Sequence, residues 1–259
     1  MRKKTGIFVW AMLLLVGELS AQEIPLTEYA PLDEVAGEVC ESDDLLPMNE
    51  LGMESGYLLY ETEIESTGTA AELEIEHVRD YASVFVDGRL VGTLTDGGNR
   101  IDIEAPAGRH TLRLYVENIG RITYGPEILD NSRGLFGEAR LGGEELLGWR
   151  IIPLGIREGD PASLIYRPLG TEPVEPGFRR GRFDATEPAA AYLDVSGWGM
   201  GEVWINGCYL GSFWDEERQQ SIRIPDGLLR PKENTLVVFD LKNVDPTTGM
   251  HLSNEPVFN

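Results

Sequence analysis

The chain has 259 residues, with 22 lysines and arginines against 44 aspartates and glutamates, and its formal net charge is −22 at pH 7. Such an acidic chain is not expected to bind nucleic acid or anionic membranes, because like charges repel. Nothing in the sequence brings its two cysteines, Cys40 and Cys208, together, so two unpaired thiols are expected. The length suits one large β-domain or two ordinary ones.

Residues 1–21 have the pattern of a secretory signal peptide. Three basic residues at 2–4 precede an uncharged apolar stretch at 7–16, and Leu-Ser-Ala at 19–21 is a small-residue cleavage site. The apolar stretch is too short to span a bilayer, which favours a cleaved signal over a membrane anchor. We therefore expect a secreted or periplasmic protein without membrane attachment after cleavage.

The remaining chain predicts short strands rather than helices. Residues 22–50 are rich in proline and acidic residues without a clear period, and are interpreted as an acidic leader. Strand character then recurs in the first half at 57–64, 73–76, 83–86, 90–94, 101–103 and 111–116. It recurs in the second half at 192–195, 203–205, 209–214, 221–224 and 235–241. Many short strands with turn signals between them predict a β-sandwich or jelly roll.

One hairpin pattern occurs twice. Residues 84–94 and 203–214 are each an apolar strand, a turn and a short apolar return, with Asp87-Gly88 in one turn and Asn206-Gly207 in the other. Asp-Gly and Asn-Gly tolerate positive φ at both central positions of a type I′ turn, so they are strong hairpin signals. The repetition favours one β-domain used twice.

The later strands of the two halves match as well. His-Thr-Leu-Arg-Leu-Tyr-Val at 110–116 parallels Asn-Thr-Leu-Val-Val-Phe-Asp at 234–240, and a cluster of proline and glycine within 155–176 marks the boundary. We therefore expect two tandem β-sandwich domains and a tail, at 51–155, 156–246 and 247–259.

Residues that carry metal or nucleophilic chemistry are not grouped in the sequence. The three histidines, His77, His110 and His251, form no HExxH or Cys/His cluster, and no EF-hand loop is present, so neither a metal nor a cofactor is predicted. No Gly-x-Ser-x-Gly elbow exists, and the glycine-rich segment 197–201 is not followed by a helix as a phosphate cradle would be. Among so many carboxylates, spacing selects no catalytic pair.

Aromatic residues are the remaining candidates for binding. Secreted β-sandwiches often bind a sugar by stacking a ring against its apolar face, and the carbohydrate-binding candidates here are Trp198, Trp204, Tyr209 and Trp214. The competing interpretation is that these rings fill the core.

Two further residues leave alternatives open. Trp204 lies between Val203 and Ile205, so a second core, a partner surface or a ligand must cover one face of this strand. Arg121, in a dense polar segment, is a further carbohydrate-binding candidate that would either clamp a carboxylate or pin a loop.

Ordered motifs in this chain resemble the β-domains of the β-galactosidases of glycoside hydrolase family 35. The C-terminal β-domain of that family is similar to Pro-Gly-Phe-Arg-Arg-Gly-Arg-Phe at 176–183 and to the segments at 195–207, 210–214 and 219–225. Its first β-domain is similar to residues 51–60, and its Val-Glu-Asn-x-Gly-Arg segment to residues 116–125. The chain departs from the family at Cys208 and Ser212. The resemblance implies two galactose-binding-domain-like sandwiches.

The resemblance also implies what the chain does. In the family a (β/α)₈ barrel precedes the β-domains and carries two catalytic glutamates, but 22–50 leaves no room for a barrel and no position for either glutamate. The first hypothesis is a secreted, non-catalytic protein that binds carbohydrate or a partner in glycan breakdown. The alternative is a β-galactosidase subunit that docks a separately encoded barrel through exposed apolar faces. An autonomous galactosidase has little support.

Overall fold

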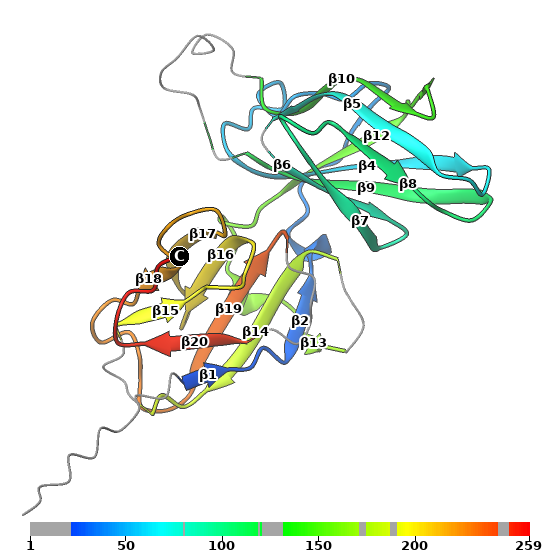
Figure 1. Cartoon of the computed structure of the whole chain (residues 1–259). Helices are drawn as coiled ribbons and strands as arrows, with labels where there is room; N and C mark the ends of the chain where they lie inside the picture. The colour runs from blue at the N-terminus through cyan, green and yellow to red at the C-terminus, as the bar shows by residue number, and fades with distance from the viewer. Residues whose placement is uncertain are drawn as a thin grey trace, which may run out of the picture.

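The computed structural model describes residues 22–79, 81–118, 120, 132–170, 175–186, 191–242 and 249–259. These residues form two antiparallel β-sandwiches, one above the other in Figure 1, which confirms the predicted all-β fold of two sandwich domains. The expected signal peptide at 1–21 and the candidate Arg121 lie outside the described residues.

The first sandwich pairs a six-stranded with a four-stranded sheet. The larger sheet has the order β3 (Cys40–Ser42), β12 (Trp149–Leu154), β4 (Gly56–Ser66), β9 (Gly108–Asn118), β6 (Tyr81–Val86) and β7 (Arg89–Thr95). The smaller sheet has the order β11 (Glu144–Glu145), β10 (Gly134–Leu141), β5 (Ala71–Arg79) and β8 (Arg100–Ile103). Their inner faces enclose a core that includes Leu58, Ile75, Leu114 and Trp149.

The second sandwich repeats this plan. Its six-stranded sheet has the order β13 (Arg167–Pro168), β2 (Glu28–Pro31), β14 (Gly177–Phe183), β19 (Asn234–Asp240), β16 (Met200–Ile205) and β17 (Cys208–Trp214). Its four-stranded sheet has the order β1 (Gln22–Ile24), β20 (Met250–Ser253), β15 (Tyr192–Asp194) and β18 (Ser221–Arg223). Two short 3₁₀ helices, η1 (Leu32–Val35) and η2 (Pro161–Ser163), lie in the segments that connect the sandwiches.

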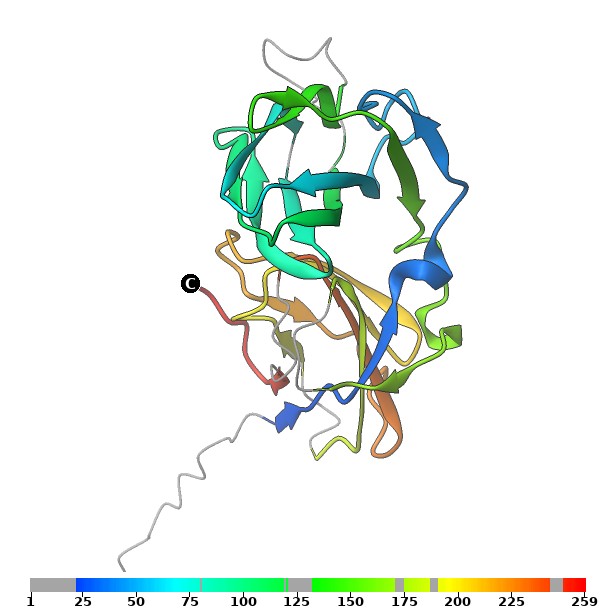
Figure 2. The same ribbon diagram turned by 90° about the vertical axis from the view of Figure 1, so that its right-hand side faces the viewer.

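The interpretation of 22–50 as a leader was wrong, as was that of 247–259 as a tail. Strands β1 and β2 complete the second sandwich and β3 completes the first, while β20 lies between β1 and β15. Figure 2 shows the N-terminal segment, in blue, running along the side of both sandwiches. These strands of three or four residues show no period in sequence, and their partners lie far along the chain, as in the pair Arg179 and Tyr29.

Both predicted hairpins are confirmed. Asp87 and Gly88 have φ of 48° and 77°, and Asn206 and Gly207 have φ of 53° and 78°, which is the positive φ that a type I′ turn requires. The first joins β6 to β7 and the second joins β16 to β17, each at the edge of its six-stranded sheet.

Each hairpin turn is held to the neighbouring strand by the same contact. Asp87 Oδ1 accepts a hydrogen bond from the backbone N–H of Thr111 at 2.9 Å, and Asn206 Oδ1 accepts one from that of Thr235 at 3.0 Å. The residue before each threonine completes the clamp. His110 Nδ1 lies 2.6 Å from Asp87 Oδ2, whereas Asn206 Nδ2 donates to Asn234 Oδ1 at 3.0 Å. The first clamp therefore includes an ionisable pair and the second is neutral.

The two six-stranded sheets pack against each other by their outer faces. Tyr57 contributes from the first sandwich, and Phe178, Trp204 and Phe239 contribute from the second, to a third apolar cluster. The rings of Tyr57 and Phe239 meet edge to face with centroids 4.9 Å apart. Among the alternatives left open for Trp204, the structure therefore shows a second core.

A buried carboxylate lies inside this interface. Glu202 on β16 is 0% exposed and accepts hydrogen bonds from Tyr57 Oη at 2.8 Å, Arg157 Nε at 2.6 Å and Tyr209 Oη at 2.6 Å. Tyr57 belongs to the first sandwich and Arg157 to the segment after β12, so the network joins the two domains. Burial, together with the charge of Glu202, raises the pKa of Tyr57 well above its usual value, which keeps its hydroxyl a donor.

The first hairpin clamp is expected to make unfolding pH-dependent. Its hydrogen bond to Asp87 raises the pKa of His110 above the usual 6.5 and lowers that of Asp87 below 3.8. The stabilisation is therefore fully present between pH 3.8 and pH 6.5. It is lost as pH rises through the folded pKa of His110 or falls through that of Asp87. In His110→Asn, which copies the second clamp, the melting temperature should fall less than in wild type between about pH 6 and pH 9. An identical pH profile would contradict this assignment.

The Glu202 network should show as a large loss of stability on mutation. Glu202→Gln leaves buried donors without an anionic acceptor, and we expect a loss of roughly 2–3 kcal/mol in the free energy of unfolding, measured in urea. Tyr209→Phe removes one donor from a half-exposed ring and should cost about 1 kcal/mol. Equal effects of the two variants would show that the carboxylate does not organise the interface.

Candidate functional site

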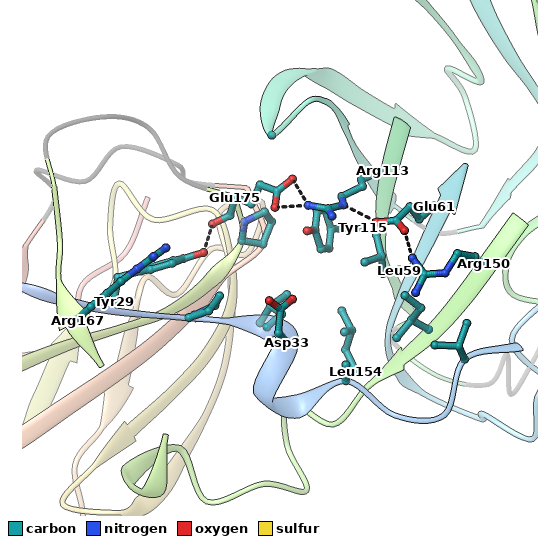
Figure 3. A pocket seen from close by; sticks show the side chains of 17 residues that line it. Tyr29, Asp33, Leu59, Glu61, Arg113, Tyr115, Arg150, Leu154, Arg167 and Glu175 are labelled. Atoms are coloured by element: carbon teal, nitrogen blue, oxygen red, sulfur yellow. Dashed lines mark hydrogen bonds and ion pairs between the residues drawn. The ribbon is translucent and has the colours of Figure 1, made fainter. Parts of the chain in front are cut away.

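A cleft of about 540 Å³ opens between the two sandwiches (Figure 3). Its first wall is the outer face of β4, β9 and β12, and its second is formed by β2, η1 and the residues before β14. Gly88, in the turn of the first hairpin, also lines it, and a Cβ added there would lie 3.7 Å from Glu175 Oε1. The cleft is therefore built from both domains and from the segments that join them.

A row of alternating charges crosses the cleft. Register places Arg150 on β12 opposite Glu61 on β4, and Glu61 opposite Arg113 on β9. Arg113 Nε donates to Glu61 Oε2 at 2.7 Å and its Nη1 lies 2.8 Å from Glu175 Oε2, while Arg150 pairs with the other oxygen of Glu61. Figure 3 shows the row running from Glu175 across to Arg150. The row thus bridges the second sandwich to the first.

The ion pairs hold these side chains in fixed geometry. Burial disfavours the charged form of Arg113, but Glu61 and Glu175 outweigh it, so the pKa of the guanidinium is raised further above its usual value. Its planar fork is oriented by both carboxylates, and a ligand would meet groups that need no reordering.

Two tyrosine rings complete the cleft. Burial raises the pKa of Tyr29 to about 12, and its hydroxyl donates to the backbone carbonyl of Glu175 at 3.2 Å. The guanidinium of Arg167 lies over the Tyr29 ring, 5.4 Å from its centroid. Burial also raises the pKa of Tyr115, so both phenols stay neutral. Asp33 is exposed at the opposite side of the cleft, and within the described part of the chain its carboxylate has no side-chain partner.

The four aromatic candidates from the sequence do not gather in the cleft. Trp198 is 2% exposed in the core of the second sandwich, where its Nε1 donates to the carbonyl of Gly249, and Trp204 is 3% exposed in the interdomain interface. Trp214 is half-buried against that interface, and Tyr209 is 46% exposed with its hydroxyl on Glu202. None of the four lines the cleft. For Trp198 and Trp204 the competing core interpretation holds.

The residues of the cleft were missed because they come from different strands and from the connecting segments. One signal was available: inward Leu112, Leu114 and Val116 on β9 put Arg113 and Tyr115 together on the other face. Which strands would bring Glu61 and Arg150 beside Arg113 depended on sheet order.

Other predictions meet the structure only in part. Cys40 and Cys208 are both free thiols, as expected. Within the described ranges no group of three or more His, Cys, Asp or Glu side chains is placed to hold a metal ion. In the same ranges no helix is long and apolar enough to cross a membrane. The absence of a cofactor, the secreted or periplasmic location and the partners stay predictions.

Two family models match the chain. The model for "Beta-galactosidase, first all-beta domain" matches residues 46–155, and that for "Beta-galactosidase, galactose-binding domain" matches residues 176–234. The fold and these matches define a pair of glycosidase accessory β-domains, one for each sandwich.

Curated relatives agree with this class. A β-galactosidase of Xanthomonas manihotis is 37% identical over 82% of this chain, and the human β-galactosidase-1-like protein 2 is 31% identical over 84% of it. The chain belongs to the β-galactosidase family, as its motifs predicted. It spans only 35% and 37% of the length of these two relatives.

Solved structures are only distantly similar. An apo lectin of Pleurotus ostreatus is 12% identical, with a TM-score of 0.28 over 91% of this chain and 81% of the lectin. A likeness at this level carries no argument about function.

Proposed function

We propose that this chain is a secreted, non-catalytic carbohydrate-binding module of the β-galactosidase type, and that it takes a neutral galactoside in the interdomain cleft. The observation that carries the proposal is the fixed row of Glu175, Arg113, Glu61 and Arg150 beside two tyrosine rings. The match of the second sandwich to a galactose-binding domain supports the choice of sugar.

The chemistry of the cleft suits a sugar. Each sugar hydroxyl both donates and accepts, so it pairs well with alternating carboxylates and guanidinium groups. Three arginines, Arg113, Arg150 and Arg167, face three acids, Asp33, Glu61 and Glu175, which balances the lining charge and favours an uncharged ligand. A cleft of 540 Å³ lies within the range of roughly 300–1,000 Å³ common for small-molecule sites.

The same contacts argue against glycoside hydrolysis in the cleft. Hydrolysis requires one carboxyl that gives up a proton and a second that attacks or activates water. Glu61 and Glu175 are both bound to Arg113, an arrangement that suits fixed acceptors more than a proton donor.

A second candidate is a subunit that works with a separately encoded barrel. The names of the curated relatives favour it, since they are β-galactosidases. It was expected to leave broad apolar faces open, but the outer faces of the two six-stranded sheets cover each other. The exposed large hydrophobic side chains of the described residues come from separate segments: Val39, Leu90, Leu147, Ile165, Tyr209 and Phe258. The carbohydrate-binding role is therefore preferred.

Calorimetric titration tests the cleft. Galactose and lactose should bind the purified chain, and Asp33→Ala combined with Arg150→Ala should weaken binding by roughly tenfold or more, because charged hydrogen bonds are lost. Arg100→Ala is the matched control, since Arg100 lies on the other sheet of the first sandwich and pairs there with Glu72 and Glu74. Silence across a broad glycan array, or equal binding by both variants, would sink the proposal.

A chromogenic assay tests the non-catalytic role. We expect the purified chain to release no p-nitrophenol from p-nitrophenyl β-galactoside above the enzyme-free blank, because hydrolysis needs two working carboxyls and two of the three in the cleft, Glu61 and Glu175, are bound to Arg113. Turnover above that blank would show that the chain is an enzyme in its own right.

A further inference from the structure

A second, smaller cavity of about 260 Å³ lies on the second sandwich and shares no lining residue with the cleft. Its lining residues come from the outer face of β14, β19 and β16, from η2, from the turn after β16 and from the loop before β19. Trp204 and the Asn206-Gly207 turn, both named in the sequence analysis, line it, but its arginines were not predicted, and the proposed galactoside site does not include it.

Strand register explains where this cavity forms. Phe178 on β14 and Phe239 on β19 are paired and lie in the interdomain interface. Two residues further along β14, on the same face, Arg180 pairs with Val237. After two more residues Arg182 pairs with Thr235. The outer face of the sheet thus changes from apolar to basic along its strands, and the cavity lies at the basic end, next to Trp204 and Val237 of the interdomain cluster.

Three arginines line the cavity, and they are held differently. Arg180 is fixed by two hydrogen bonds to Glu28, at 2.7 and 2.8 Å, and its guanidinium lies 3.7 Å from the ring centroid of Tyr166. Arg182 is 64% exposed and reaches the same carboxylate only at 3.4 Å. Arg230 is exposed, and within the described ranges no carboxylate lies within ion-pair distance of it.

The lining therefore carries excess positive charge. Among the described lining residues Arg180, Arg182 and Arg230 face one acid, Glu233, and Glu28 beside them pairs with Arg180 and Arg182, so the arginines still outnumber the carboxylates. Arg182 and Arg230, which have spare donors, line the same cavity as the almost fully buried Trp204 and Val237. Guanidinium forks bind carboxylates with paired hydrogen bonds.

We propose that this cavity binds the carboxylate of an acidic sugar, one uronic acid residue, through Arg182 and Arg230. Arg180 is already held by Glu28 and Tyr166, so it would contribute its positive charge to the cavity rather than a hydrogen bond to the ligand. The cavity, at 260 Å³, is slightly smaller than the roughly 300 Å³ at the lower end of common ligand sites, which suits a single ring. The module would then recognise a neutral galactoside in the cleft and an acidic residue here.

Titration with sodium galacturonate, galactose and sodium sulfate tests this site. Galacturonate should bind with one-to-one stoichiometry, and Arg182→Gln combined with Arg230→Gln should weaken it by roughly tenfold or more. Arg223→Gln is the matched control, because Arg223 is an exposed arginine of the same sandwich, outside the cavity and paired with Asp226. Circular dichroism melting of all variants shows whether the fold is kept.

The outcomes separate this site from the cleft. Galacturonate binding that survives in Asp33→Ala with Arg150→Ala, but not in the double glutamine variant, supports the proposal even if galactose fails to bind anywhere. Sulfate that binds as tightly as galacturonate and displaces it would mean an adventitious ion only. That result, absence of galacturonate binding, or equal loss in Arg223→Gln would overturn the proposal.

Discussion

The two sandwiches are held together by the outer faces of their six-stranded sheets, and the positions of the other features depend on this contact. Strands β6 and β16 are buried at every position, so along these two strands neither sheet has the solvent-exposed face that an isolated β-sandwich shows. Glu202 lies fully buried in this contact. A buried carboxylate is costly unless it is paired, and Tyr57, Arg157 and Tyr209 supply its donors. Another packing of the sandwiches would take Tyr57 of the first sandwich away from that charge, so the network favours this arrangement.

Both proposed binding sites lie where this contact ends. On the first sandwich, the outer face of β4, β9 and β12 continues past the apolar cluster into the row of Arg150, Glu61 and Arg113. On the second, the outer face of β14 and β19 continues into Arg180 and Arg182. The charge of each lining follows from which residues these faces carry. The cleft is balanced between acids and bases and suits a neutral sugar, whereas the smaller cavity is basic and suits an acidic one.

The duplicated hairpin shows how the two copies have diverged on one backbone plan. Asp87 and Asn206 both take positive φ and both accept a hydrogen bond from a threonine on the next strand. The turn requires only a short side chain whose oxygen can accept this hydrogen bond, so either aspartate or asparagine fits. Their second partners, His110 and Asn234, make the first clamp sensitive to pH and the second insensitive. The first turn also borders the cleft, through Gly88.

The sequence by itself determined the local structure of this protein and its family. Alternating strands, two Asx-Gly turns and the ordered motifs were enough, because strand period and turn φ depend on near neighbours. It did not determine that Gln22–Ile24 and Glu28–Pro31 complete the second sandwich, nor that Trp204 is covered by the first. The sequence also did not predict that Glu61 lies beside Arg113. Those facts depend on strand order and on the packing of one sheet against another, which join residues far apart in the chain and leave no periodic trace in it.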